Sequence, residues 1–561
     1  MPVIELSLTK LKQRMKNTRS QTEILEALPY LGLDLEGVEG DDVSVEYSPN
    51  RPDFSSEAGI ARALAGILGV EVGLPKYHFS QSKFAISVAD DQIRRVRPHI
   101  FGLYAETYVN EELIKELIAM QEDLHNGLGR RRSTVAIGIH NGAVISRDLS
   151  YFGSTDDSFS FVPLGSEKKT SIKEILSGTD QGIQYGRILS QGVYPILQDS
   201  EGHILSMPPI INGEHTRLKE GISSLFVDIT ATDEIAGDAV IAIIASMLND
   251  TGAKVETTRI EYSGSQIITP NMEPLHRNFD LELVNKNLGF NFSLDEAKTY
   301  LGRSRIELSD RKTALVPRFR ADIIHPVDLS EEIALGYGVG RIEALKVESS
   351  ASGAFNRKLR KLDECVEILI GLGFTEIWNF SLVSKELASH CGTTLRVENP
   401  KSQNYEYLRC DITSSLLSTL SSSTDQEYPQ KIFELAPVFT TTGNSQTKGV
   451  TGISEPYHCA AMIAGAAVNY TEIRSAIDGF LRIAPTTKDS KIVLQPLSFE
   501  SQYYLKGRSA ELLLSNGNGS GKEENAGIVG EISPSALSTF GIGVPVAGFE
   551  LDLAKLLSIK E

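Results

Sequence analysis

The chain has 561 residues, 41% of them hydrophobic and 23% charged, which is an ordinary composition for a globular protein of roughly three to five domains. Its 73 acidic and 55 basic residues give a formal net charge of −18. A surface of that sign repels phosphate overall, so any contact with nucleic acid must use local basic patches. Three candidates are Arg94–Arg97, Arg130–Arg132 and Arg357–Lys361, and each is also typical of an ordinary solvated face.

Nothing in the sequence predicts secretion or a membrane span. Met1–Lys10 is amphipathic without a long apolar segment, and the longest apolar run, Ala239–Leu248, is too short to cross a bilayer. The four cysteines are scattered without a CxxC pair, which fits neither a zinc site nor a disulfide framework: Cys365, Cys391, Cys410 and Cys459. We therefore expect a reduced, cytoplasmic protein that does not contact a membrane.

The pattern of short alternating strands and amphipathic helices predicts a multi-domain α+β fold. The clearest helix covers Glu57–Leu68, where the apolar residues share one face, Glu57 lies in the first turn and Gly69 follows the last.

Segments rich in glycine, serine or proline interrupt this pattern at Leu74–Gln81, Ser263–Pro274 and Val347–Gly353. A fourth such segment, Ser515–Asn525, is expected to be a surface loop between two strands. We therefore expect domains over residues 1–78, 91–260, 268–346 and 354–561.

Residues 5–70 and 280–342 follow the same order of helix-like and strand-like segments. Both place a proline and an arginine before an aspartate and then enter a helix: Pro49, Arg51 and Asp53 in the first copy, Pro317, Arg320 and Asp322 in the second. We interpret the two stretches as versions of one small helix-and-sheet module, because the period is too long and the copies too few for a solenoid.

An acidic cluster occurs in the second copy only: Asp322, Asp328, Glu331 and Glu332. On a helix that begins near Asp328, residues three and four apart share a face, so Glu331 and Glu332 flank the direction of Asp328. Converging carboxylates repel unless a cation or basic groups compensate them, and hard oxygen ligands suit Mg²⁺. The alternative is a capping box of Asp328 and Glu331, with the acids at the positive end of a helix dipole.

Other motifs do not support an active site of their own. The segment GNGSGKEE at Gly517–Glu524 lacks the leading glycine and the final Ser/Thr of a phosphate-binding loop. GYGVG at Gly336–Gly340 follows a predicted helix rather than a strand, unlike a dinucleotide-binding loop. The chain has no HExxH or GxSxG motif, and its ten histidines show no metal-ligand spacing.

Longer segments resemble the β chains of phenylalanyl-tRNA synthetases of the archaeal and eukaryotic type. YSPNRPDFSSEAGIARALAG is similar to their N-terminal module, and AIGIHN, FVPL, LSMPPIINGEHTRL and LFVDITATD to their editing domain. FRADIIHPVDLSEEIALGYGVGRI is similar to the following helix-and-sheet (B5-like) domain, and NPKSQNYEYLRCDITSSLL with KIFELAPVF to their class II synthetase-like module. The resemblance covers nearly the whole chain in the family's order.

The resemblance implies an α2β2 heterotetramer in which the α subunit uses ATP to activate phenylalanine and transfers it to tRNA(Phe). The β chain is then expected to hold the α subunit and tRNA and to hydrolyse mischarged Tyr-tRNA(Phe). The family also implies a Mg²⁺ site, shared with the α subunit, at the acidic cluster: Asp322, Asp328, Glu331 and Glu332.

Within the editing-like segment, Asn212 and Glu214 are candidates to hydrogen-bond the tyrosine hydroxyl, and Pro208 with Pro209 to form a rigid wall. A polar turn after a strand is the alternative interpretation of either polar residue. No Ser–His–Asp or metal-hydrolase set is evident near them, so hydrolysis is expected to depend on a positioned water and on the tRNA itself.

The class II-like segment is not expected to perform ligation. Arg409 and Glu434 occupy positions where such a core could hold a nucleotide, but no glycine-rich, arginine-terminated closing motif follows, so an internal ion pair is the better interpretation. Neither HIGH nor KMSKS, the class I signatures, is present. Two rival hypotheses remain: a stand-alone hydrolase that acts on mischarged tRNA, and an RNA-binding scaffold without any active site.

Overall fold

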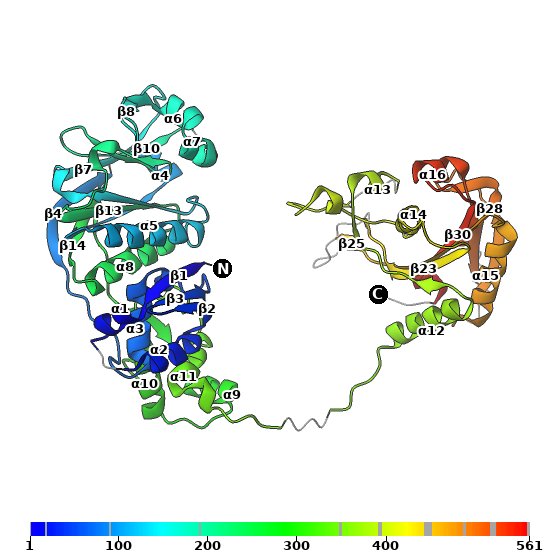
Figure 1. Cartoon of the computed structure of the whole chain (residues 1–561), viewed down its shortest axis with the longest axis horizontal. Helices are drawn as coiled ribbons and strands as arrows, with labels where there is room; N and C mark the ends of the chain where they lie inside the picture. The colour runs from blue at the N-terminus through cyan, green and yellow to red at the C-terminus, as the bar shows by residue number, and fades with distance from the viewer. Residues whose placement is uncertain are drawn as a thin grey trace. The chain divides into compact units, whose positions relative to one another are not determined.

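The protein is described here from a computed structural model, which covers residues 2–16, 19–88, 91–189, 192–346, 351–390, 395–441, 452–485, 490–516 and 523–557. Two compact units are present, Met1–Lys346 and Val347–Glu561 (Figure 1). Helices and several separate sheets occur in both, so the predicted α+β class is confirmed. Cys391, residues 347–350 of one predicted break and residues 517–522 of the predicted loop lie outside the described residues.

The first module of unit Met1–Lys346 is a three-stranded antiparallel sheet of order β1-β3-β2. Its strands and helices are β1 (Val3–Ser7), α1 (Leu8–Arg14), α2 (Gln21–Ala27), β2 (Leu33–Glu39), β3 (Asp42–Tyr47) and α3 (Glu57–Ile67), with 3-10 turns at Leu28–Leu31 and Pro52–Ser55. Helix α3 begins after Ser56, whose hydroxyl accepts from the Gly59 N–H, and Gly69 follows it at φ +71°. The predicted helix is therefore confirmed, with the expected glycine stop.

A ten-stranded sheet forms the middle of this unit, in the order β12-β11-β10-β7-β4-β14-β5-β13-β6, with β15 paired to β14. The strands are β4 (Ser80–Val88), β5 (His99–Glu106), β6 (Val135–Asn141), β7 (Asp148–Ser154), β10 (Tyr194–Gln198), β11 (Ile204–Met207), β12 (Ile211–Asn212), β13 (Ser224–Ala231), β14 (Lys254–Tyr262) and β15 (Ser265–Thr269). Two long helices, α5 (Glu111–Asn126) and α8 (Glu234–Asp250), pack on β5, β6 and β13 through one apolar core (Figure 1).

Shorter elements connect these strands: α4 (Asp91–Val96), β8 (Ser160–Phe161), β9 (Thr170–Ser171), α6 (Ile172–Gly178) and α7 (Asp180–Tyr185), with 3-10 turns at Gly142–Val144, Gly186–Leu189 and Glu214–Thr216. The apolar run Ala239–Leu248 lies in α8 and is buried in the core. None of the described helices is long and apolar enough to span a membrane.

The last module of the unit repeats the topology of the first. Its three-stranded sheet has the order β16-β18-β17, so the strand third in sequence lies between the other two, as in β1-β3-β2. The elements are β16 (Leu275–Asn278), α9 (Leu281–Leu288), α10 (Leu294–Arg303), β17 (Glu307–Leu308), β18 (Thr313–Val316), α11 (Asp328–Tyr337) and a 3-10 turn at Val339–Arg341. In each copy a loop with the Arg-x-Asp sequence leads from the central strand into a helix, which is the repeat that the sequence predicts.

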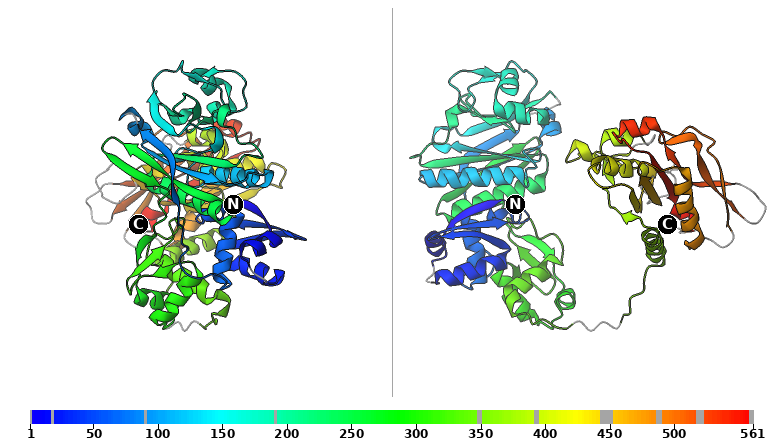
Figure 2. Two further views of the ribbon diagram at one scale, coloured as in Figure 1. Left: turned by 90° about the vertical axis from the view of Figure 1, so that its left-hand side faces the viewer. Right: turned by 45° about the vertical axis from the view of Figure 1, so that its right-hand side comes forward.

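Unit Val347–Glu561 is built on a seven-stranded sheet of order β19-β23-β26-β30-β29-β28-β27, which Figure 2 shows from two further sides. Its strands are β19 (Thr375–Glu376), β23 (Gln430–Pro437), β26 (Tyr457–Ala464), β27 (Ser490–Pro496), β28 (Tyr504–Asn516), β29 (Glu524–Ile532) and β30 (Val546–Asp552). Alternate residues of β26 enter two cores, one beneath α12 (Arg357–Gly371) and α15 (Tyr470–Ile483), the other beneath α14 (Thr413–Ser422) and α16 (Pro534–Thr539). Helices therefore cover both faces of this sheet.

The remaining elements of this unit are short: β20 (Leu382–Val383), α13 (Lys385–Ser389), β21 (Leu395–Arg396), a 3-10 turn at Gln403–Tyr405, β22 (Tyr407–Leu408), β24 (Thr440–Thr441), β25 (Ile453–Ser454) and α17 (Leu553–Leu556).

The cysteine prediction is wrong at one position. Cys410 is disulfide-bonded, whereas Cys365 and Cys459 are buried free thiols. Spacing along the sequence does not show which cysteines the fold brings together, so the absence of a CxxC pair was a poor guide here.

Candidate functional site

The domain of the ten-stranded sheet encloses a cavity of about 500 Å³. Strands β6 and β12, which end the sheet path on opposite sides, both contribute to its wall, together with α5 and the segment Ser206–Ile211. Isoleucine, leucine and proline side chains, including Pro208 and Pro209, supply less than half of the lining, and polar or charged side chains supply a similar share. A mixed cavity of this size fits a small organic side chain that carries a polar group.

Three buried polar residues form a hydrogen-bonded chain at this cavity. His140 Nε2 lies 2.7 Å from Asp228 Oδ1, and His140 Nδ1 lies 2.8 Å from Thr216 Oγ1. All three side chains are buried, and Thr216 and Asp228 line the cavity. Because a carboxylate only accepts, a neutral His140 donates from Nε2 and leaves Nδ1 to accept the Thr216 hydroxyl proton. A base is thus positioned to take a proton from a hydroxyl.

The fold explains how these residues meet. His140 is on β6 and Asp228 on the adjacent β13, opposite Gly138 in the pairing register. A Cβ atom at Gly138 would lie 2.3 Å from Asp228 Oδ1 and 2.6 Å from His140 Nε2, so only glycine leaves room for the contact. Sequence neighbours alone could not indicate this contact, because His140 lies 76 positions from Thr216 and 88 from Asp228.

One further hydroxyl at the cavity has no partner. Ser206 Oγ is buried in the wall and makes no hydrogen bond within the described part of the chain. Leaving a buried donor unsatisfied costs about 1–3 kcal/mol, so a polar group of a bound molecule would relieve this cost.

The two predicted specificity residues are placed differently. Asn212 lines the cavity, and its side chain has no hydrogen bond among the described residues. Glu214 is not part of the wall: its carboxylate accepts from the Gly165 N–H at 2.8 Å and from Arg217 at 3.3 Å. The Gly165 hydrogen bond lowers the pKa of Glu214. Glu214 therefore fastens the loop around Gly165 beside the cavity rather than facing it.

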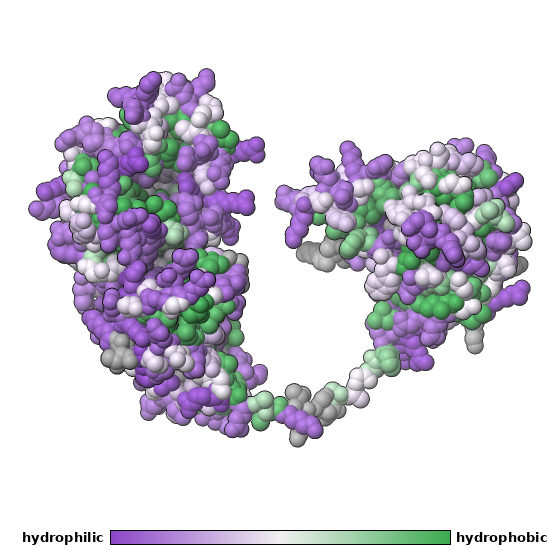
Figure 3. All heavy atoms as spheres, viewed as in Figure 1, coloured by the Kyte–Doolittle hydropathy of each residue, from purple (hydrophilic) through white to green (hydrophobic). Residues whose placement is uncertain are grey.

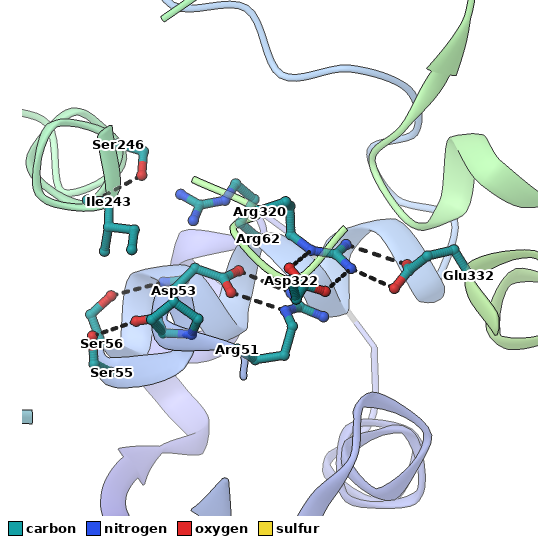
Figure 4. Close-up of polar contacts among 12 residues, drawn as sticks. Arg51, Asp53, Ser55, Ser56, Arg62, Ile243, Ser246, Arg320, Asp322 and Glu332 are labelled. Atoms are coloured by element: carbon teal, nitrogen blue, oxygen red, sulfur yellow. Dashed lines mark hydrogen bonds and ion pairs between the residues drawn. The ribbon is translucent and has the colours of Figure 1, made fainter. Parts of the chain in front are cut away.

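The acidic cluster is compensated by an arginine of the same chain. Arg320 is buried and donates to both oxygens of Asp322 at 2.8 and 2.7 Å, and also to both oxygens of Glu332, one of them at 3.3 Å (Figure 4). Burial, the largest single influence, raises the pKa of Asp322, but the Arg320 charge, its hydrogen bonds and the Arg51 charge together outweigh it, so the pKa lies below its usual value.

The other two acids lie apart from this contact. Asp328 Oδ2 accepts from the N–H groups of Ile324 and His325, both at 2.7 Å, which fixes the turn into α11. Glu331 is exposed and makes no ion pair with a described residue. Among the described residues no group of three His, Cys, Asp or Glu side chains is arranged to hold a metal ion. The four predicted ligands therefore do not make a complete Mg²⁺ site on this chain.

The first copy of the module contains the same arginine–aspartate pair. Arg51 donates to both oxygens of Asp53 at 2.9 Å and lies 3.8 Å over the Phe54 ring. Figure 4 shows this pair beside Arg320 and Asp322, and the Arg51 charge also contributes to the lowered pKa of Asp322. The pair is therefore a structural feature common to both copies, and the acidic pair Glu331–Glu332 is an addition to the second.

In unit Val347–Glu561 the ion-pair interpretation of Arg409 and Glu434 is confirmed. Their side chains are buried, with Nη1 and Oε1 2.6 Å apart, and Glu434 also accepts from Asn379. Both partners are therefore occupied by structural contacts.

A separate cavity of about 590 Å³ in this unit is lined by two half-buried acids, Asp411 and Glu550. Burial and the charge of Glu550 raise the pKa of Asp411 to about 6.

Comparisons with known proteins match both units. A family model described as the tRNA synthetase B5 domain matches residues 277–339, and one described as the phenylalanyl tRNA synthetase beta chain CLM domain matches residues 343–553. A phenylalanine–tRNA ligase beta subunit of Archaeoglobus fulgidus is 34% identical over 100% of both chains, and that of Methanococcoides burtonii is 32% identical over 99% of this chain and 100% of the relative.

Among solved structures, an N-terminal fragment of the Pyrococcus horikoshii phenylalanyl-tRNA synthetase beta subunit is 30% identical, with a TM-score of 0.57, and covers 60% of this chain and 100% of the fragment. Full-length identity above 30% and the order of the matched domains show that the chain belongs to the family of phenylalanine–tRNA ligase β subunits.

Proposed function

We propose that this chain is the proofreading subunit of a phenylalanine–tRNA ligase and that its cavity hydrolyses Tyr-tRNA(Phe). Tyrosine is phenylalanine with one added hydroxyl, and an apolar pocket rejects such an addition only weakly. Accurate charging with phenylalanine therefore needs a second site whose polar groups recognise the hydroxyl and remove tyrosine. The observation that carries the proposal is the buried, hydrogen-bonded set Thr216–His140–Asp228 at a cavity whose wall is partly apolar and partly polar.

The lining supports a division of roles. Ser206 and Asn212 offer free hydrogen-bonding groups to the phenol, and the proline wall excludes larger groups. Glu214 then acts indirectly, by fastening the loop at Gly165.

The hydrolytic step follows from the donor–acceptor order of the hydrogen-bonded residues Thr216, His140 and Asp228. A water oxygen attacks the ester carbonyl carbon and passes its proton to Thr216 Oγ, while the Thr216 proton moves to His140 Nδ1, and Asp228 stabilises the resulting imidazolium. The ester C–O bond then breaks, and the ribose oxygen takes the proton back. The products are tyrosine and uncharged tRNA.

Replacing Thr216 with valine tests the proposal, because valine keeps the shape and removes the hydroxyl. General acid–base assistance contributes roughly 10²- to 10⁴-fold, so Thr216→Val should slow clearance of Tyr-tRNA(Phe) by that order. Phenylalanine charging by the complex with the α subunit should stay unchanged. Wild-type clearance by the variant would contradict the assigned role.

We also propose that unit Val347–Glu561 binds the α subunit. Trp378 and Phe380 are 89% and 74% exposed, and Phe355 is 89% exposed, which is unusual for large apolar side chains. Hydrophobic patches are visible on the surface of this unit (Figure 3). Such a surface favours a subunit over a stand-alone hydrolase.

A label on the tryptophan tests this interface directly. The chain contains one tryptophan, so 5-fluorotryptophan gives a single ¹⁹F signal. Adding unlabelled α subunit should shift and broaden it, and Trp378→Ala with Phe380→Ala should weaken the complex by roughly 10-fold or more. An unmoved signal in a sample shown by sedimentation to contain the complex would place the interface elsewhere.

The chain alone should show no phenylalanine-dependent ATP–pyrophosphate exchange, which should appear when the α subunit is added.

Magnesium is proposed only as a shared ligand of the assembly. Asp322 and Glu332 are already paired with Arg320, so a site there needs groups from the α subunit. Mg²⁺ should accordingly bind the complex more tightly than this chain, and Asp328→Asn with Glu331→Gln should remove the difference. Equal calorimetric titrations of chain and complex would remove this proposal.

We place the assembly in the cytoplasm, where its tRNA is used, which cell fractionation can check.

A further inference from the structure

We propose that the exposed side chains of Arg130 and Arg131 form a phosphate clamp for the single-stranded 3′ end of tRNA beside the cavity. The inference rests on the proposed function, because only a hydrolase of aminoacyl esters needs that end of the RNA at this cavity. It assigns a role to one of the three basic patches of an otherwise acidic chain.

The backbone of this turn is unusual. Arg130, Arg131 and Arg132 have φ values of 45°, 55° and 66°, three consecutive non-glycine residues in the left-handed region. Such residues are unfavourable one by one, and a run of them persists only where the surroundings hold it. Local strain of this kind is concentrated at functional positions, which motivates a search for what the turn displays.

A buried arginine holds the turn from inside. Arg97 is 1% exposed and donates to the carbonyl oxygens of Arg132 and Ser133, both at 3.2 Å. Its remaining donors reach Thr230 Oγ1 at 2.8 Å and the Thr230 carbonyl at 2.9 Å. On the outer side, the Arg130 carbonyl accepts from the Ser133 hydroxyl at 2.7 Å. The carbonyls of the turn are thus fixed, and so are the directions in which its side chains leave the backbone.

The three arginines divide between the wall and the solvent. Arg132 lies in the cavity wall, where it donates to the Ile210 carbonyl at 3.2 Å and to Glu122 at 3.1 Å, and packs 4.4 Å from the Tyr185 ring centre. Arg130 and Arg131 are exposed, and neither side chain has a hydrogen bond or ion pair with any residue that the structure describes. Two guanidinium groups without a described partner therefore directly precede, in the sequence, an arginine of the cavity wall.

Arg130 also borders a second hollow, of about 700 Å³, whose other polar residues are Asn50, Thr134, Thr232 and Asp233. The Asp233 carboxylate accepts from the Ala236 N–H at 3.0 Å as the cap of α8 and makes no ion pair with Arg130 among the described residues. Guanidinium groups bind phosphate in a bidentate manner, and a fixed backbone lowers the entropy lost on binding.

The test uses the full chain and a five-nucleotide RNA with the 3′-terminal sequence of tRNA(Phe), labelled with fluorescein at its 5′ end. Arg130→Gln with Arg131→Gln should raise its Kd by roughly 10-fold or more, and should reduce the slope of log Kd against log salt by about 1.4, for two lost phosphate contacts. The matched control is Lys298→Gln with Arg311→Gln, two exposed cations of another module, which should leave both values unchanged.

Single-turnover clearance of Tyr-tRNA(Phe) separates the clamp from the chemistry. The double arginine variant should need more protein for half-saturation and reach the wild-type rate, whereas Thr216→Val should keep the wild-type half-saturation and lose the rate. A double arginine variant with wild-type Kd, salt slope and half-saturation would overturn the clamp. If the wild-type chain fails to hydrolyse Tyr-tRNA(Phe) but binds the RNA through these arginines, the proposed function fails and the clamp stands.

Discussion

Replacing Arg320 with methionine probes the charge balance of the second module. Arg320 is 3% exposed and holds two carboxylates, Asp322 and Glu332, that are themselves largely buried. Methionine keeps most of the apolar stem and removes the cation. Glu332 then loses the ion-pair partner that the structure describes for it, and Asp322 keeps only the charge of the nearby Arg51, while Asp328 and Glu331 add repulsion.

The expected loss is large. Removing one partner of a buried ion pair costs about 3–5 kcal/mol, against a domain stability of about 5–15 kcal/mol. Amide exchange in α11 and β18 should therefore accelerate by roughly two to nearly four powers of ten at pH 7, since about 1.4 kcal/mol corresponds to tenfold. Peptides of unit Val347–Glu561 provide an internal control, and Arg311→Met, at an exposed position, provides the matched variant.

The pH dependence should reverse sign. In the wild type the pKa of Asp322 is lowered, so its contribution to stability is present above the unfolded pKa of about 3.9 and is lost as pH falls through the folded value. In Arg320→Met the main influence that opposes burial is lost and only the Arg51 charge remains, so the folded pKa of Asp322 is expected to rise above the unfolded one. The variant should then be most stable at low pH and lose stability as pH rises through the folded pKa.

Two results would refute this reasoning. Wild-type exchange in α11 at pH 7 would show that Arg320 does not compensate these acids. A variant whose deficit grows as pH falls would show that the lost interaction is not with carboxylates. Adding Mg²⁺ to the variant asks a related question: recovered protection in α11 would show that the acids accept the metal once the arginine is gone.

Three further predictions concern other positions. Gly138→Ala should lower Tyr-tRNA(Phe) clearance by roughly 10²-fold, because its Cβ would lie 2.3 Å from Asp228 Oδ1. Gly165→Ala is the control: Gly165 is not part of the hydrogen-bonded set and has a φ of +83°, so this change should affect stability more than rate. Asp411→Asn should stabilise unit Val347–Glu561 by about 1–3 kcal/mol at pH 8 and by little at pH 4. The reason is that the folded pKa of Asp411, about 6, lies above the unfolded value, so the ionised carboxylate destabilises the folded state at high pH. Equal gains at both pH values in denaturant unfolding would contradict this. Arg131→Gly should raise the free energy of unfolding by about 1 kcal/mol by relieving a φ of 55°, while weakening RNA binding; destabilisation in the same assay would show that the turn is not strained.

The repeat and the main helices could be predicted because their signals are local. Hydrophobic periodicity, Ser56 as a cap and Gly69 as a stop lie within one helix, and the Arg-x-Asp sequence marks both copies of the module. The same sequence also contained the answer to the acidic cluster. Compensation of the acids by basic groups was one of the two possibilities that the sequence left open, and Arg320, two residues from Asp322, is such a group.

The chemistry of the cavity could not be predicted in the same way. His140 meets Asp228 because β6 and β13 are neighbours in the sheet, and it meets Thr216 because a 3-10 turn returns to the same wall. No spacing rule connects residues so far apart. Glu214 illustrates the opposite error: a carboxylate close in sequence to Asn212 faces a loop N–H instead of the cavity, because its position in the turn directs it there.

Arginine placement is what allows an acidic chain to handle an acidic ligand. Arg97 is buried in the core, Arg132 lies in the cavity wall, and Arg130 and Arg131 are exposed. Within the part of the chain that the structure describes, Arg97 and Arg132 have hydrogen-bond partners and the exposed pair has none. Arg97 donates to backbone carbonyls, and Arg132 donates to the Ile210 carbonyl and to Glu122, so neither is available to bind RNA. The net charge of the whole chain is −18, so its surface repels RNA on average. Under the proposed clamp, the positive charge of Arg130 and Arg131 attracts RNA to this part of an acidic surface. Neutralising the two arginines should therefore weaken tRNA binding at this position more than it lowers the rate of hydrolysis in the cavity.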